Sequence, residues 1–177
     1  MNFLSNSRFN IIFPFDQIDF SEDKFSHIAD ALSYGEAIVP IYEQNQTRSD
    51  LEKLLLLAQK LPNCQLYVLI HSERNLNFFT NFQATPNVKV GVYIPTEQLL
   101  HNCIYFGRSY NFGMQIYILR RLFILNVKPF TLCDPDTIND INNYVELVAN
   151  YSDDLFFIRN SSQNSEIAST FQERVVQ

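Results

Sequence analysis

Four ionisable residues in this chain of 177 residues have the side chains of a catalytic or cation-binding site. They are Asp16, Glu43, His71 and Asp134, and each comes after an apolar run. Because imidazole titrates near neutral pH, His71 is the candidate general base or metal ligand. The three carboxylates are candidates to orient that imidazole or to share a cation with it.

A second set of four charged residues is suited to binding a ligand. Glu73, Glu97 and Arg159 come just after apolar runs, and Arg108 lies in the segment FGRSYNFG. An anion in that segment would meet an arginine and the open N–H groups of a helix N-terminus. The alternative is structural, because polar residues must appear wherever an apolar strand emerges into water, and acids favour helix N-termini.

Motifs that would narrow the chemistry are absent from the sequence. The chain has no HExxH, GxSxG, Walker or GxGxxG motif, and it contains only 4 glycines. Its 3 cysteines form no CxxC pair and are expected to be reduced core thiols. Cys133, directly before Asp134, is the alternative candidate for a reactive thiol. No metal site is predicted from a motif, and the cofactor stays unknown.

Six apolar runs have the length and composition of β-strands. They cover residues 9–15, 37–42, 66–70, 88–94, 129–133 and 155–158. Most are nearly continuous rather than alternating, which is typical of parallel strands covered by helices on both faces. The sequence therefore predicts an α/β fold with a mostly parallel sheet of five or six strands and helices on both faces. A partial β/α barrel is the alternative.

Helical patterns separate the first three runs. Ser21 is expected to cap a helix that ends at Gly35. Thr47 or Ser49 opens a second helix, whose leucine stripe stops before Pro62. Alternation of strand and helix with this spacing is typical of right-handed βαβ crossovers, so it supports the parallel sheet.

The second half of the chain is expected to continue this alternation. A helix is predicted from Asp136 or Thr137, and the long crossover 95–128 is predicted to hold two helices joined by FGRSYNFG. Residues 1–160 are predicted to form a single α/β domain. Residues 161–177 are predicted to be a polar C-terminal tail or a loosely docked helix.

Charge and hydropathy exclude several classes of partner. A formal net charge of -6 argues against duplex nucleic acid and against an anionic membrane, because both require a cationic surface. No apolar run reaches the roughly 20 residues of a transmembrane helix, and the N-terminus lacks the pattern of a secretory signal. A cytoplasmic protein is therefore expected.

Two functions are compatible with these features. The first is a non-enzymatic binding or protein-interaction domain with a small-ligand site at the C-terminal ends of the strands. Its expected partner is another protein, a second copy of the chain or a small anionic ligand. Two aromatic clusters motivate it, since aromatic side chains anchor interfaces when they are exposed; the alternative is that both clusters belong to the core. The clusters are Phe78, Phe79 and Phe82, and Tyr105, Phe106, Tyr110 and Phe112.

The second function is a hydrolase-, lyase- or transferase-type enzyme. In that hypothesis His71 is the general base, and Asp16, Glu43 and Asp134 orient it or bind a metal. Whether the protein is an enzyme stays open at the level of sequence. Both hypotheses require the loops that follow the strands to lie at one edge of the sheet.

Overall fold

The computed structural model describes residues 11–12, 36–41, 48–74, 76–98, 102–105 and 108–176. Side chains are described from Leu51 onward, apart from those of residues 75, 83–84, 99–110 and 177. Two compact units emerge from the contacts within the chain. We call residues 9–90 the N-terminal unit and residues 91–177, to which 1–8 also belong, the C-terminal unit.

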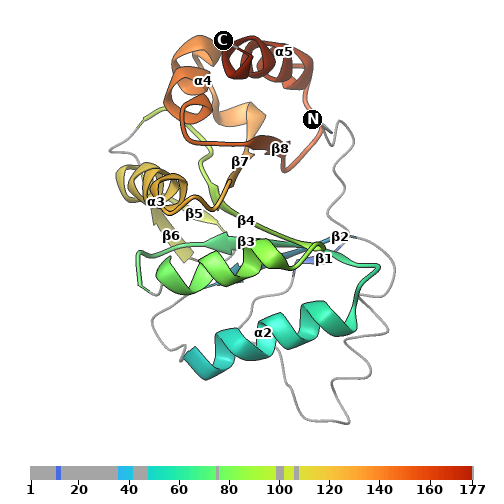
Figure 1. Ribbon diagram of the computed structural model, residues 1–177. Coiled ribbons are helices and arrows are strands. Elements are labelled where there is room, and N and C mark those ends of the chain that lie inside the picture. Colours follow the sequence, from blue (N-terminus) through green and yellow to red (C-terminus); the bar gives the residue numbers. More distant parts are fainter. Residues whose placement is uncertain are drawn as a thin grey trace. The chain divides into compact units, whose positions relative to one another are not determined.

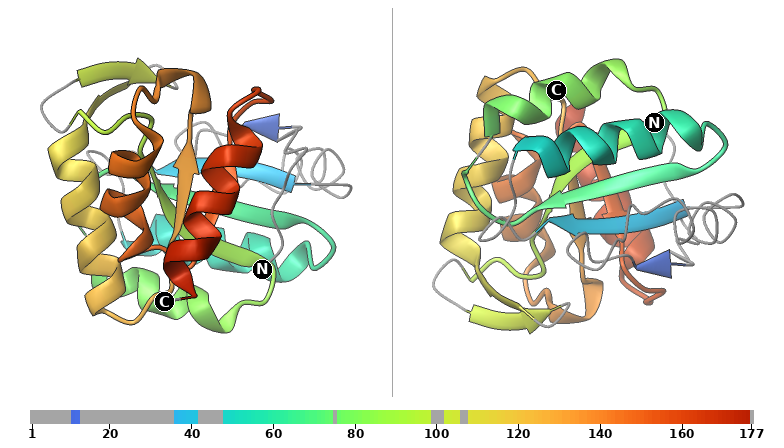
Figure 2. Two further views of the ribbon diagram at one scale, coloured as in Figure 1. Left: turned by 90° about the horizontal axis from the view of Figure 1, so that it is seen from above. Right: turned by 90° about the horizontal axis from the view of Figure 1, so that it is seen from below.

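The described residues of the N-terminal unit form three parallel strands, two helices and the first half of a fourth strand. Its elements are β1 (Ile11–Ile12), β2 (Glu36–Ile41), α2 (Arg48–Lys60), β3 (Gln65–Ile70), the 3-10 helix η3 (Leu76–Ala84) and the first half of β4 (Val88–Tyr93). The strand order is β1-β2-β3, and β2 and β3 lie side by side in Figures 1 and 2. Every residue of β3 after Gln65 is buried, as expected for a strand that is covered on both faces.

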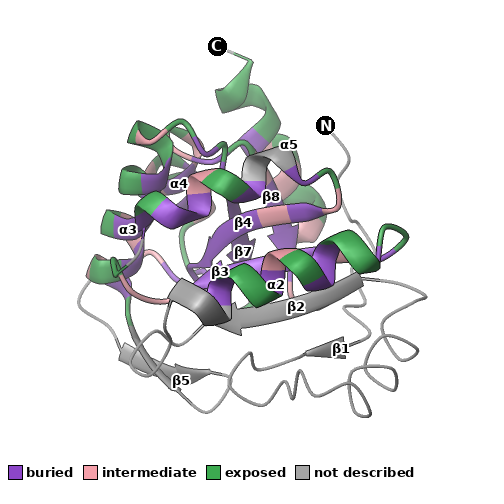
Figure 3. Cartoon of the chain, turned by 60° about the horizontal axis from the view of Figure 1, so that its bottom comes forward, coloured by how far each residue is buried: buried purple, intermediate pink, exposed green. Residues whose placement is uncertain are grey.

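Helix α2 follows the predicted leucine pattern. The residues that recur on its inner side, Leu51, Leu54 and Ala58, are fully buried, whereas Glu52 and Lys53 are exposed. Buried and exposed residues accordingly alternate along this helix in Figure 3. Burying an apolar stripe of this kind is the main source of stability for a helix of this length.

The C-terminal unit contains three parallel strands, a hairpin and three α-helices among its described residues. After β4 come β5 (Asn102–Tyr105), β6 (Arg108–Asn111), α3 (Phe112–Ile124), β7 (Phe130–Cys133), the 3-10 turn η4 (Pro135–Thr137), α4 (Ile141–Ala149), β8 (Asp154–Phe157) and α5 (Asn164–Val175). Strand β7 pairs in parallel with both β4 and β8, and β5 and β6 form a separate antiparallel pair. Helices α4 and α5 lie side by side (Figure 1).

Gly91 is required where β4 pairs with β7. It lies directly opposite Phe130 in the register of the two strands. A Cβ atom at this position would lie 2.5 Å from Cγ of Phe130, well inside van der Waals contact. Glycine therefore lets the Phe130 ring pack against the β4 backbone, which is a common use of glycine inside a strand.

The structure confirms the predicted α/β class and the parallel pairing of its strands. The four sheet strands with described side chains are β3, β4, β7 and β8, and helices separate them along the chain. The predicted number of five or six strands in one sheet is not confirmed, because each unit is described by itself. The single domain predicted for residues 1–160 also stays a prediction.

The crossover 95–128 differs from its prediction. Instead of two helices, it contains the β5–β6 hairpin and one helix, α3, and FGRSYNFG supplies β6 and the first turn of α3. Asn111 does open that helix, because its side chain accepts a hydrogen bond from the N–H of Met114 at 3.0 Å.

Two further predicted helices have different outcomes. The helix expected from Asp136 or Thr137 begins later, since those residues form η4, and the α-helix starts after Asp140, whose carboxylate caps the N–H of Asn143. The helix predicted between Ser21 and Gly35 lies outside the described residues.

The C-terminal stretch contains α5, which buries Ile167 and Phe171. None of the helices in the described ranges has both the length and the apolar character needed to cross a membrane.

Candidate functional site

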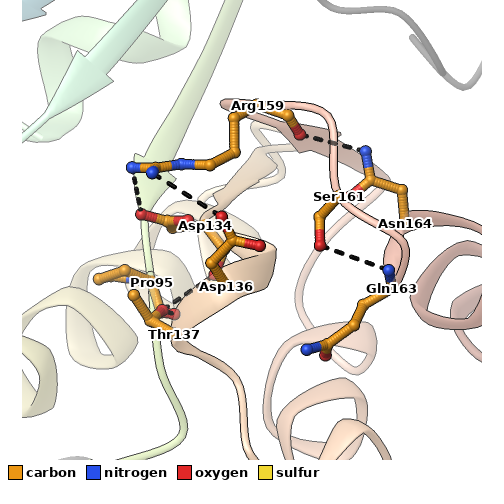
Figure 4. A network of polar contacts seen from close by, with 8 residues as sticks. All are labelled: Pro95, Asp134, Asp136, Thr137, Arg159, Ser161, Gln163 and Asn164. Atoms are coloured by element: carbon orange, nitrogen blue, oxygen red, sulfur yellow. Dashed lines mark hydrogen bonds and ion pairs between the residues drawn. The ribbon is translucent and has the colours of Figure 1, made fainter.

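The carboxyl ends of β4, β7 and β8 carry a connected group of polar residues. β7, β8 and the second half of β4 belong to the C-terminal unit and run parallel, so the loops that follow them emerge at the same edge. The group contains Pro95 after β4, Asp134, Asp136 and Thr137 after β7, and Arg159 after β8 (Figure 4). Ligands of parallel α/β sheets bind at this edge, because loops and helix N-termini converge there.

Asp134 and Arg159 form the central ion pair of this group. Nη2 of Arg159 donates a hydrogen bond to Oδ2 of Asp134 at 2.9 Å. The Asp134 side chain is only 6% exposed, whereas that of Arg159 is 50% exposed. A second carboxylate, that of Asp136, lies 3.8 Å from Nη1 of Arg159 and is itself half exposed. The Arg159 guanidinium is thus held on one side by the buried Asp134 carboxylate and is open to solvent on the other side.

The Asp134 carboxylate has an unsatisfied oxygen. Its Oδ1 atom is buried and accepts no hydrogen bond from any residue in the described part of the chain. Burial raises the pKa of this carboxyl group above its ordinary value, and the positive charge of Arg159 and the backbone N–H of Asp136 offset only part of that shift. Asp134 therefore loses more hydration in the folded state than its protein partners replace.

Thr137 holds the loop after β7 against the end of β4. Its hydroxyl group donates to the carbonyl oxygen of Pro95 and also lies 2.9 Å from the carbonyl oxygen of Asp134. The N–H of Thr137 donates to the same Asp134 carbonyl at 3.1 Å, which closes the turn η4. These contacts fix the backbone on which the Asp134 side chain stands.

Asn164, at the start of α5, holds the loop after β8. Its Nδ2 atom donates to the carbonyl oxygen of Arg159 at 3.1 Å. Within the same loop, the N–H of Gln163 donates to Oγ of Ser161 at 3.4 Å, as Figure 4 shows. The backbone of Arg159 is therefore anchored independently of its guanidinium, which supports a fixed position for the outer N–H groups.

Glu97 follows β4 in the same unit but has a local set of contacts. Its Oε2 atom lies 3.4 Å from Oγ1 of the buried residue Thr96, and the N–H of Gln98 donates to that same Oγ1 atom at 3.4 Å. The Glu97 side chain is half-buried. Glu97 thus lies in one of the loops of the site, without a recorded contact to the Asp134–Arg159 pair.

The other predicted site residues are placed differently. His71 and Glu73 follow β3 in the N-terminal unit, where His71 is half-buried and Glu73 is exposed. Arg108 is the first residue of β6, and its side chain is outside the described part of the structure. Asp16 and Glu43 lie outside the described residues altogether. The structure therefore brings together Asp134 and Arg159, and leaves the catalytic set around His71 a prediction.

Two residues next to the site have reactive side chains, and both are buried. Cys133 is fully buried, and burial raises the pKa of its thiol far above the ordinary range. Tyr144 donates its hydroxyl hydrogen to the carbonyl oxygen of Ile94 at 2.5 Å, and burial raises its pKa as well. Both groups stay protonated near neutral pH, so Cys133 has the properties of a core residue and not of a nucleophile.

Metal binding finds no support in the described ranges. They contain no group of three or more His, Cys, Asp or Glu side chains arranged to hold an ion.

The aromatic clusters proposed as interfaces prove to be core wherever their side chains are described. Phe79 and Phe82 are fully buried, and Phe78 packs edge-on against both. Phe112 is also fully buried. The interface interpretation of these four residues was wrong, because their helices turn them inward. The side chains of Tyr105, Phe106 and Tyr110 lie outside the described part.

Sequence reasoning missed the two residues that position the ion pair, Thr137 and Asn164. A polar residue a few positions after a strand-ending charge was the available signal, since such residues often hydrogen-bond the nearby backbone. Comparison of the chain with protein-family models, with curated proteins and with solved structures finds no match.

Proposed function

We propose that this protein is a non-enzymatic binding domain for a small monoanionic ligand that also carries a hydroxyl or ammonium group. The ligand binds at the carboxyl ends of β4, β7 and β8. The observation that carries this proposal is the Arg159 guanidinium, which is half exposed and yet held by a buried carboxylate at 2.9 Å.

Arg159 is suited to the anionic end of the ligand. A guanidinium presents five N–H donors, and the hydrogen bond to Asp134 uses one of them. Asp136, at 3.8 Å, is beyond hydrogen-bonding distance and attracts Arg159 mainly by charge. The donors on the open side can bind a carboxylate in the two-pronged manner that arginine favours.

Asp134 is suited to a donor group on the same ligand. Leaving a buried acceptor without a hydrogen bond costs about 1–3 kcal/mol, and more for a charged group. Because Oδ1 is itself buried, a ligand hydroxyl or ammonium would recover that energy once binding displaces the side chains that cover this atom.

The charges around Arg159 limit how many negative charges the ligand can carry. Asp134 and Asp136 together outweigh the single positive charge of Arg159. A ligand with two or more negative charges would be repelled, whereas a monoanion with a donor, or a zwitterion, matches both halves of the site.

Binding is favoured over catalysis by the state of the neighbouring groups. Asp134 is committed to its ion pair, and Cys133 and Tyr144 are kept neutral by burial. Cys133 and Tyr144 are therefore poorly suited to exchange protons with a ligand near neutral pH, and Asp134 is held by Arg159 in a position to bind one.

A thermal-shift comparison of four small probes tests the proposal. Acetate has the anion alone, glycerol has hydroxyl groups alone, and glycolate and glycine have an anion together with a donor. Because a ligand that binds the native state raises the melting temperature, glycolate or glycine should raise it most, acetate less and glycerol least, at equal ionic strength.

The matched variants are Arg159→Gln and Arg174→Gln. The first removes the proposed anion contact, and the second removes an exposed arginine in the last turn of α5. The glycolate and glycine shifts should disappear in Arg159→Gln and persist in Arg174→Gln. Equal shifts in both variants, or equal shifts with all four probes, would contradict the proposal.

A further inference from the structure

Helix α3 carries an exposed stripe opposite its buried face. The buried residues are Phe112, Gln115, Ile118, Leu119 and Leu122. On the other side, Met114, Tyr117 and Ile124 are 41%, 43% and 58% exposed, and Arg121 is exposed with them. Large apolar side chains that lie exposed in a row, and not singly, are typical of a binding surface. We call these four residues the α3 stripe.

The spacing of the α3 stripe is symmetric. Its members follow one another at intervals of three, four and three residues, so they lie on one side of the helix. The outer two, Met114 and Ile124, are apolar. The inner two, Tyr117 and Arg121, are an aromatic ring and a guanidinium, which are the two halves of a cation–π pair.

This symmetry makes the stripe complementary to itself in one orientation. If two copies of α3 pack antiparallel about a two-fold axis, Met114 faces Ile124 of the other copy and Tyr117 faces Arg121. In a two-fold interface each such contact occurs twice. In a parallel arrangement Arg121 would face its own counterpart, and the two charges would repel each other.

We propose that two copies of this chain associate through their α3 stripes, packed antiparallel about a two-fold axis. The described surface of α3 supplies both halves of each contact, so no second surface is needed. The proposal is independent of the ligand site, because none of the four stripe residues belongs to the Asp134–Arg159 group.

The interface is small, and its affinity should be modest. A helix of 13 residues is about 20 Å long, and a single pair of such helices buries less area than a standard stable interface. We expect a dissociation constant on the order of 10 μM, which makes the dimer visible only as a dependence on concentration.

The salt dependence of binding distinguishes a second copy of this chain from an acidic partner at the α3 stripe. Each chain carries a formal charge of -6, so two copies repel each other, and Arg120 and Arg121 lie exposed on α3. Salt screens the repulsion between the two negative chains, so dimerisation should strengthen as salt rises from about 0.05 M to 0.5 M. An acidic partner would instead bind the two arginines less tightly at high salt.

A residue swap tests the pairing directly by sedimentation velocity over a range of concentrations. Tyr117→Arg places arginine against arginine, and Arg121→Tyr places tyrosine against tyrosine. Tyr117→Arg should raise the dissociation constant about tenfold, since two cation–π contacts are lost per dimer and like charges take their place. Arg121→Tyr exchanges the same contacts for two aromatic pairs and should change the constant by less than about threefold. The double variant Tyr117→Arg with Arg121→Tyr restores both contacts and should return the constant to within about threefold of the parent value.

Leu56→Arg is the control, because it replaces another exposed apolar residue, on α2, with arginine. It should leave dimerisation unchanged, and circular dichroism should show that all variants fold. A parent chain that stays monomeric at every concentration and salt would overturn the proposal. Single changes that weaken the dimer without rescue by the double variant would overturn the antiparallel pairing, as would binding of an acidic helical peptide by a monomeric parent chain.

Discussion

Two polar side chains, one in each unit, hold loops in place, and they differ in how completely they are satisfied. In the N-terminal unit, Nδ2 of Asn87 lies 2.9, 2.8 and 3.0 Å from the carbonyl oxygens of Ala58, Leu61 and Cys64, where α2 ends. In the C-terminal unit, Asp134 uses one oxygen for Arg159 and leaves the other without a partner in the described structure.

The difference separates a structural role from a binding role. Asn87 directs its two N–H donors at three carbonyl groups at the end of α2 and in the turn that follows it, so its whole amide nitrogen serves the fold. Asp134 has one carboxylate oxygen without a hydrogen-bond donor at a strand end. This lowers the stability of the fold, which is a typical cost at a site where a ligand supplies the donor. Substitution of Asn87 should therefore reduce stability, whereas substitution of Asp134 should reduce ligand binding.

The largest expected effect is at Asn87. Asn87→Asp replaces the donors with a carboxylate that faces three carbonyl oxygens, and it should reduce the free energy of unfolding by about 3 kcal/mol. Urea denaturation measures the loss. Asn63→Asp, at an exposed position in the turn after α2, is the matched control and should change stability by less than about 0.5 kcal/mol. A similar loss of stability in both variants would show that the three carbonyl contacts of Asn87 do not give it a special structural role.

The next largest effect is at Gly91, in the unit that carries the site. Gly91→Ala inserts a methyl group into the space of the Phe130 backbone and ring, and should destabilise the protein by about 2 kcal/mol. The double variant Gly91→Ala with Phe130→Ala should lose less than the sum of the single effects, because it removes Cγ and the ring and leaves only the carbonyl oxygen of Phe130 close to the methyl group. If the losses of the two single variants simply add in the double variant, the strain does not arise from the contact between residues 91 and 130.

A small effect on stability and a large effect on binding are expected for Asp134→Asn. The amide keeps the shape of the side chain, removes a buried charge and retains an acceptor for Arg159, so the melting temperature at pH 7 should stay the same or rise. The shift produced by glycolate or glycine should nevertheless fall to that of acetate. A marked loss of stability in this variant would assign Asp134 the same structural role as Asn87.

The smallest effect is a dependence on pH. A carboxyl group whose pKa is raised in the folded state opposes folding once it ionises. The penalty is absent below its ordinary pKa of 3.8 and is complete above the raised pKa. The stability of Asp134→Asn relative to the parent should therefore increase as pH rises from about 4 to 7. Urea denaturation at several pH values measures the difference, and a constant or opposite trend would contradict the assigned direction.

Much of the local structure could be predicted from the sequence. The run 66–70 and the observed β3 (Gln65–Ile70) differ by one residue, and the leucine pattern before Pro62 correctly predicted α2. These elements were readable because a strand that is buried on both faces is a continuous apolar run, and burial of one helix face imposes a period of 3.6 residues. The β5–β6 hairpin was missed because its strands, NCIY and RSYN, are four residues long and contain no such run.

The start of α4 was misplaced for a different reason. Asp136, Thr137 and Asp140 are all good helix caps, and the sequence offers no means of ranking them. The tertiary structure does, because Thr137 is drawn to the carbonyl oxygen of Pro95 at the end of β4 and Asp140 is left to cap the helix. The same contact positions the backbone of Asp134.

The sequence by itself determined the class of fold and the charged residues at the strand ends, because apolar periodicity and residue type are local properties. Only the tertiary structure decided that Asp134 meets Arg159, 25 residues away, while Phe78 and Phe79 turn into the core. Pairing of β7 with β8 sets which loops become neighbours, and packing sets which face of a helix is buried. Both are long-range outcomes that residue spacing alone does not specify.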